Sequence, residues 1–164
     1  MSDRRETSTV LPVVPDPSPP WPSPLHARAS AIAAVAIGGM IGAPARYGLG
    51  VLFPQTPPGH WPVTTFAINF IGAFVLGGLL EALARLGPDS GWRQRVRLCI
   101  GTGVIGSFTT YSTLAVDTDL LLRGHHPWSA ITYALGTVIA GMVATALGIA
   151  MGTWMTSRRG EEQN

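Results

Sequence analysis

The chain has 164 residues, of which 46% are apolar and only 12% are charged. A soluble domain carries about 25% charged residues, so this composition excludes a fully water-exposed globule. The single cysteine, Cys99, excludes an internal disulfide and a cysteine-based metal cluster. The net charge of +2 is small and scattered, which argues against nucleic acid as a partner. Composition therefore favours one small membrane protein.

Residues 1–28 contain seven prolines and six charges that cancel. Such a segment buries too little apolar surface to offset the entropy of ordering, so it predicts a disordered, proline-rich N-terminal tail. Apolar sequence then comes in four blocks of 22 to 27 residues, at 29–52, 63–84, 96–122 and 128–154. About 20 apolar residues cross the hydrocarbon core of a bilayer. Residues 29–157 therefore predict a four-helix transmembrane domain, followed by a polar C-terminal tail at 158–164.

Arginine placement predicts how these spans are oriented. Nine of the eleven arginines lie in the N-terminal tail, the connection between the second and third blocks, and the C-terminal tail. The opposite side carries Arg123 alone, and Arg46 falls inside the first block. Loops rich in arginine stay in the cytoplasm, so we expect a multi-pass protein of the cell membrane with both termini cytoplasmic.

The third block has an unusual centre, in which three glycines, at 101, 103 and 106, precede five hydroxyl residues at 109–113. A continuous helix gains nothing from this composition, whereas a broken helix uses glycine to unwind and hydroxyls to satisfy the released backbone. We therefore predict a break near residues 106–110, at mid-membrane depth. Discontinuous helices are where membrane proteins place ion sites.

Polar side chains in the other blocks leave alternatives open. Arg46 either snorkels to the interface or holds a vestibule that attracts anions. Asn69 either makes a hydrogen bond between helices or faces a polar path. In the fourth block, Tyr133, Thr137 and Thr145 align at multiples of four residues. Their hydroxyls either bond the carbonyl four residues back or form a polar track.

Small residues four apart, Gly38 with Gly42 and Gly148 with Gly152, predict closely packed helices. The density of such pairs favours a tightly packed oligomer.

Four motifs, one in each block, carry a resemblance to a known family. They are Gly38-Gly39-x-x-Gly42-Ala43-x-x-Arg46-Tyr47, Thr65-x-x-x-Asn69-x-x-Gly72-x-Phe74, Gly106-x-x-Thr109-Thr110-Tyr111-Ser112-Thr113 and Tyr133-x-x-x-Thr137-x-x-x-Gly141. In this order and spacing they resemble the Fluc or CrcB fluoride channels, over roughly residues 33–152.

The resemblance implies an all-α membrane protein with four transmembrane helices, the third broken at mid-membrane, assembled as an antiparallel dual-topology-type dimer with two fluoride pores. It implies a structural Na+ that is not transported, held by the backbone carbonyls of Gly106 and Thr109. The pore-lining positions that it implies are Asn69, Tyr111, Ser112, Thr113 and Thr137. The implied function is a fluoride-specific ion channel, not an enzyme, that exports fluoride passively from the cytoplasm and so lowers its toxicity.

Two positions depart from the family pattern, and one charge pattern bears on assembly. Leu114 stands where a second phenylalanine is usual, and Asp117 stands where Glu is common. A homodimer whose subunits insert both ways needs nearly balanced loops, and nine arginines against one is not balanced. We therefore predict an antiparallel heterodimer with a paralogous subunit of opposite orientation.

The competing prediction is a small proton-coupled exporter, which is also built as a four-helix antiparallel dimer. It needs an ionisable carboxylate at mid-membrane, whereas Glu81, Asp117 and Asp119 lie toward the ends of the predicted spans. Fluoride efflux measured against chloride separates the two.

Overall fold

A computed structural model describes residues 28–53, 57 and 59–161 of the chain. The proline-rich tail predicted at 1–28 lies outside the described residues except for its last position, and so do residues 162–164. The described part contains helices and connections and no strand. The helices are α1 (Ala29–Leu52), α2 (Val63–Arg85), α3 (Gly91–Val96), the π-helix η2 (Arg97–Ile105), α4 (Gly106–Phe108), α5 (Tyr111–Arg123) and α6 (Pro127–Glu161).

Three of these helices, α1, α2 and α6, are long and apolar enough to cross a membrane, within the part of the chain that the structure describes. Between α2 and α6 the chain is helical in shorter pieces. α3, η2 and α4 follow one another from Gly91 to Phe108, two residues are not helical, and α5 continues to Arg123.

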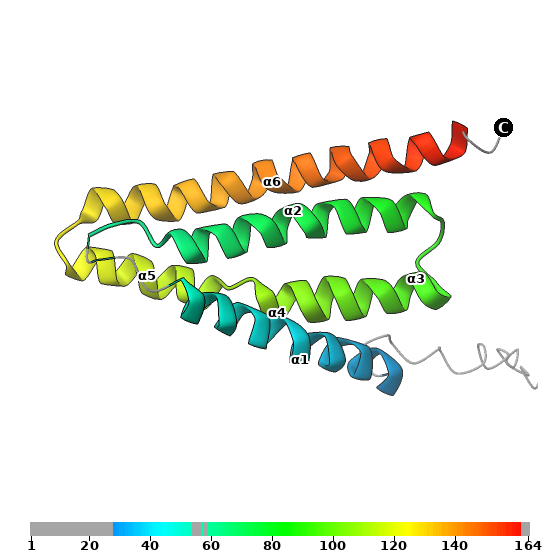
Figure 1. Cartoon of the computed structure of the whole chain (residues 1–164), viewed down its shortest axis with the longest axis horizontal. Helices are drawn as coiled ribbons and strands as arrows, with labels where there is room; N and C mark the ends of the chain where they lie inside the picture. The colour runs from blue at the N-terminus through cyan, green and yellow to red at the C-terminus, as the bar shows by residue number, and fades with distance from the viewer. Residues whose placement is uncertain (1–27, 54–56, 58, 162–164) are drawn as a thin grey trace, which may run out of the picture.

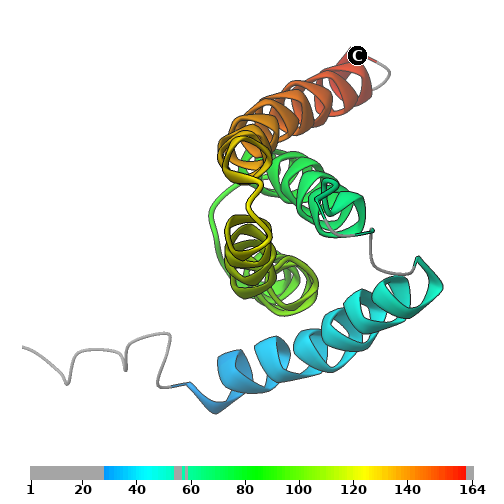
Figure 2. The same cartoon turned by 90° about the vertical axis from the view of Figure 1, so that its left-hand side faces the viewer.

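The helices lie side by side with both ends of the described chain at one end of the molecule (Figure 1). α2 packs along α6, and α1 packs against η2 and α4. The end view shows α1 inclined across the third helical segment (Figure 2). The start of α1, the connection between α2 and α3, and the end of α6 therefore share the end of the molecule that carries most arginines.

Glycines bring these helices into backbone contact. A Cβ at Gly38 would collide with the Cys99 carbonyl, and one at Gly42 with the Val104 carbonyl. A Cβ at Gly148 would collide with the carbonyl of Phe74 on α2. The small-residue pairs predicted from the sequence thus serve packing inside one subunit, because side chains of any size would push these helices apart.

The largest fully buried side chain among the described residues is Tyr133, on α6. It packs with Leu114, Leu121 and Ala130, and Trp61 lies edge-on to its ring at 5.9 Å. This cluster joins α5 to α6 near the end of the molecule remote from the termini. Leu114, which departs from the family pattern, is part of this core.

Candidate functional site

The interruption between α4 and α5 is the centre of the candidate site. Thr109 and Thr110 both have extended backbones, with φ −73° and ψ 159° at Thr109 and φ −149° and ψ 123° at Thr110. Thr110 is the N-cap of α5, because its Oγ1 accepts a 3.1 Å hydrogen bond from the Thr113 N–H. The hydroxyls of Ser112 and Thr113 lie 3.2 and 3.0 Å from the same Thr110 oxygen.

Asn69, on α2, pairs with the extended backbone of the interruption. Its Nδ2 donates to the Thr110 carbonyl at 3.0 Å, and its Oδ1 accepts from the Thr110 N–H at 2.8 Å. The Asn69 amide therefore bonds both the N–H and the carbonyl of Thr110, as a neighbouring β-strand would. It thus satisfies both backbone groups of Thr110, which lies outside the helical pattern. This contact is the hydrogen bond between helices that was one of the two alternatives for Asn69.

Two hydrogen bonds at the interruption, one from the Thr110 N–H and one from the Thr113 N–H, leave the carbonyls of Gly106 and Thr109 without their helical donors. In a continuous α-helix the N–H of residue i bonds to the carbonyl of residue i−4. Here the Thr110 N–H bonds to Asn69 instead, and the Thr113 N–H bonds to the Thr110 hydroxyl instead. Hard cations prefer such oxygens, so these carbonyls suit Na+ by donor type.

No group of three or more His, Cys, Asp or Glu side chains that could hold a metal is found in the described part of the chain.

A cavity of about 780 Å³ opens beside the interruption, between the end of α1, the start of α2 and α5. Its polar lining includes Arg46, Thr65, Thr110, Ser112, Thr113 and Asp117. Three of the predicted site residues, Arg46, Ser112 and Thr113, therefore line one cavity. Arg46 is half-buried and makes no hydrogen bond or ion pair with a described residue.

Asp117 is a buried carboxylate on the wall of this cavity, with only 8% of its surface exposed. Its Oδ2 accepts from the Thr65 hydroxyl at 2.8 Å and from the Tyr133 hydroxyl at 3.2 Å. Sequence reasoning named all three residues but did not group them, since they lie on three different helices. The only available signal was their polarity inside the predicted spans.

Other predicted site residues lie away from the cavity. Tyr111, with 82% of its surface exposed, and Gly106, which is also exposed, do not line the cavity, whereas Ser112 is exposed and lines it. Thr137 is buried on α6, where its hydroxyl donates to the Tyr133 carbonyl at 2.7 Å. The Thr145 hydroxyl makes the same bond to the Gly141 carbonyl at 2.9 Å. Both hydroxyls thus bond the carbonyl four residues back, within one helix turn.

Comparison with known proteins points in one direction. The family described as "CrcB-like protein, Camphor Resistance (CrcB)" matches residues 33–149. The chain is 47% identical over 137 residues to the fluoride-specific ion channel FluC 2 of Leifsonia xyli, a match that covers 84% of this chain and 93% of that protein. It is 47% identical over 133 residues to FluC 3 of Streptomyces avermitilis, covering 80% of this chain and 63% of that protein. FluC of Chloroflexus aurantiacus is 37% identical over 123 residues, covering 75% and 95% of the two chains.

Proposed function

We propose, from the premise that this chain belongs to the CrcB family, that it is a fluoride channel. As a member of this family it is a transporter rather than an enzyme. The proposal is that fluoride leaves the cytoplasm through it passively, down its gradient, which lowers the toxicity of the ion. The observation that carries it is the cavity at the interruption, where hydroxyls, a guanidinium and a helix N-terminus come together.

A fluoride path has to replace the water of a small, strongly hydrated anion. The first turn of α5 supplies backbone N–H groups and the positive end of a helix dipole beside the cavity. Ser112 and Thr113 add hydroxyl donors, and Arg46 attracts anions into the vestibule. Asn69, Tyr111 and Thr137 complete the pore lining in this proposal.

The proposed assembly is an antiparallel dimer in the plasma membrane. The interruption at Thr109 and Thr110 is taken as the mid-membrane break of the third of four spans. Lipid cannot satisfy polar groups at that depth, so the exposed Gly106, Tyr111 and Ser112 need protein cover. In this arrangement the carbonyls of Gly106 and Thr109 from both subunits would hold the structural Na+, which supplies positive charge at the dimer axis.

The arginine bias supports a fixed orientation for this chain. Both described ends lie at the arginine-rich end, which is cytoplasmic in this proposal (Figure 1). A partner of opposite bias, a paralogous subunit, would complete the dimer. A reporter fused to the C-terminus should then give a cytoplasmic signal alone, and an even mixture of both signals would contradict the fixed orientation.

A proton-coupled exporter is the second candidate, and Asp117 is the observation that favours it. A buried carboxylate on the wall of a cavity in a membrane protein is the kind of group that carries protons in exporters. This finding adds weight that the sequence did not give, since Asp117 was expected near a span end.

One experiment separates the candidates. The full chain is reconstituted into liposomes, alone and with its paralogous partner, and fluoride efflux is followed with an electrode against chloride. A channel gives rapid, fluoride-selective efflux that a proton gradient does not drive, and Asp117→Asn keeps it. Efflux that requires a proton gradient and is lost in Asp117→Asn would establish the exporter instead.

A further inference from the structure

A groove between α2 and α6 lies at the arginine-rich end, apart from the cavity described above. Its volume is about 400 Å³, and its lining includes Gly78, Ala82, Arg85, Met151, Gly152 and Met155. Glycine and alanine, which have the smallest side chains, form the base of the groove where the two helices approach closely. The methionines form an apolar wall. The groove is therefore narrow and apolar, and it suits a flexible apolar chain.

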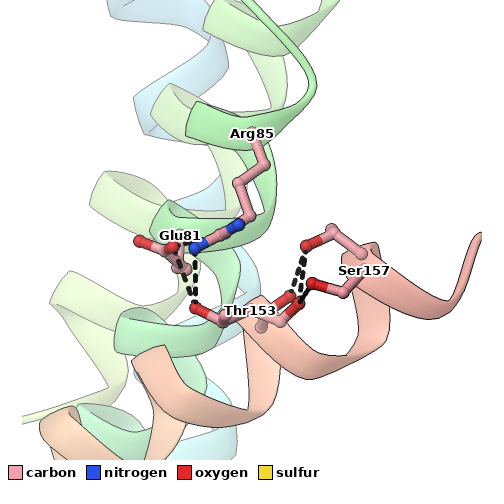
Figure 3. Close-up of polar contacts among 6 residues, drawn as sticks. Glu81, Arg85, Thr153 and Ser157 are labelled. Carbon is pink, nitrogen blue, oxygen red and sulfur yellow. Dashed lines mark hydrogen bonds and ion pairs between the residues drawn. The ribbon is translucent and has the colours of Figure 1, made fainter. Parts of the chain in front are cut away.

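A hydrogen-bonded network fixes the cationic end of this groove (Figure 3). The Nε of Arg85 donates to Oε1 of Glu81 at 2.6 Å, and its Nη2 donates to the Thr153 hydroxyl at 3.1 Å. Thr153 in turn donates to Glu81 at 3.0 Å. These bonds use one edge of the guanidinium and leave Nη1 free of any bond to a described residue, so Arg85 keeps donors for a further anion.

A second guanidinium, that of Arg158, lies beyond the groove on α6, since Arg158 is not one of the residues that line it. Met151, Met155 and Arg158 follow one another at i, i+4 and i+7, so they share one helix face. The Arg158 guanidinium lies 4.2 Å from the centroid of the Trp154 ring, and Trp154 is 55% exposed. A tryptophan in this setting prefers the headgroup layer of a bilayer, which places the end of the groove at the depth of lipid phosphates.

We propose that this groove binds one anionic phospholipid, with an acyl chain along the methionine wall and the phosphate between Arg85 and Arg158. Charge favours an anionic over a zwitterionic lipid, because Arg85 lines the groove with donors to spare beyond its pair with Glu81, and Arg158 follows the methionine wall by three positions on α6. The proposal needs only a membrane protein, and it stands whether or not the cavity conducts fluoride.

Native mass spectrometry of the detergent-solubilised full chain tests the proposal, by counting phosphatidylglycerol and phosphatidylcholine molecules of equal chain length that stay bound. We expect the protein to retain phosphatidylglycerol preferentially. An arginine near anionic lipid contributes about 1 kcal/mol, so Arg158→Gln should lower its retention about fivefold and leave phosphatidylcholine unchanged. Ala82→Phe, which fills the groove, and Met155→Glu, which puts a carboxylate at its exposed mouth, should both abolish it.

Matched controls are Arg123→Gln, at the opposite end of the molecule, and Ala146→Phe, on an exposed part of α6 outside the groove. Neither should change retention. Equal retention of the two lipids by the unaltered protein would overturn the proposal. So would an Arg123→Gln effect as large as that of Arg158→Gln, which would indicate general surface charge. Unchanged retention in Met155→Glu, whose side chain is exposed, would also overturn the proposal, because the lipid would then bind outside the groove.

Discussion

The helix α2 contacts α6 and the third helical segment, α3 to α5, through different chemistry. Toward α6 it presents glycines, and Gly77 and Gly78 lie against the backbone of Thr145 and Gly148. Toward the third segment it presents polar side chains, and Thr65 and Asn69 hold Asp117 and Thr110. The contact with α6 requires that no side-chain atoms lie between the two helices. The contact with the third segment requires particular hydrogen-bond donors and acceptors. The two faces should therefore fail under different substitutions.

Filling the glycine face should have the largest effect. Gly148→Leu places a side chain where the Phe74 carbonyl and the Gly78 N–H already lie, and backbone cannot yield as a side-chain tip does. We expect a loss above about 3 kcal/mol, so that little folded protein is recovered, as judged by size-exclusion chromatography and thermal melting in detergent. Gly141→Leu is the control, since no atom lies within 4 Å of a Cβ built there. Equal losses for the two would contradict the backbone contact as the cause.

Removing the amide from the polar face should come next. Asn69→Leu leaves the Thr110 N–H and carbonyl without partners, at a cost of about 1–3 kcal/mol for each group. We expect a lower melting temperature and the loss of fluoride efflux from liposomes. Asn69→Asp keeps the acceptor for the Thr110 N–H and loses the donor to the Thr110 carbonyl. Its melting temperature should therefore lie between those of the unaltered protein and Asn69→Leu. Normal efflux in Asn69→Leu would mean that the pairing does not support the site.

A single buried hydroxyl should matter less. Thr65→Val keeps the side-chain shape and removes the 2.8 Å donor to Asp117, which leaves Tyr133 as its remaining partner. A hydrogen bond to a carboxylate contributes about 1.5–3 kcal/mol, and thermal melting measures the loss. Thr64→Val is the neighbouring control, because its hydroxyl makes only an exposed 3.3 Å bond to the Phe53 carbonyl. A similar drop in both variants would assign the effect to helix α2 in general.

The smallest effect should come from a hydroxyl at the exposed end of the same helix pair. Thr153→Val removes the oxygen that bridges Glu81 and Arg85, but these two side chains remain paired at 2.6 Å and are partly exposed (Figure 3). Exposed ion pairs contribute about 0–1 kcal/mol, so we expect a change in melting below that of Thr65→Val. A larger change would mean that burial does not rank the polar contacts of α2.

The two faces of α2 could be predicted from the sequence to different extents. Spacing alone predicts which glycines face a neighbour, since residues four apart share a helix face, but it does not say whether that neighbour is in the same chain. The structure has Gly38 against Cys99 and Gly148 against Phe74, both inside one subunit. An oligomer was the other explanation for the same pattern.

The polar face was harder to derive, because a hydrogen bond between residues far apart in sequence leaves no periodic signal. Asn69 and Thr110 are 41 positions apart, and Thr65 and Asp117 are 52 apart. Polarity at membrane depth marks each residue as needing a partner, and only the packing of α2 on the third segment decides which. The role of Leu114 was likewise not apparent, because a leucine in a span fits lipid, pore or core alike.

The two-point pairing of Asn69 with Thr110 has a consequence for how the protein would work. To rewind into one helix, the third segment would have to give up both of these bonds, at 2.8 and 3.0 Å, and the Thr110 cap of α5 with them. We therefore expect the third segment to stay interrupted while the protein functions. The rate of ion passage would then be set by how fast an ion loses and regains its water, without an opening and closing cycle of the protein.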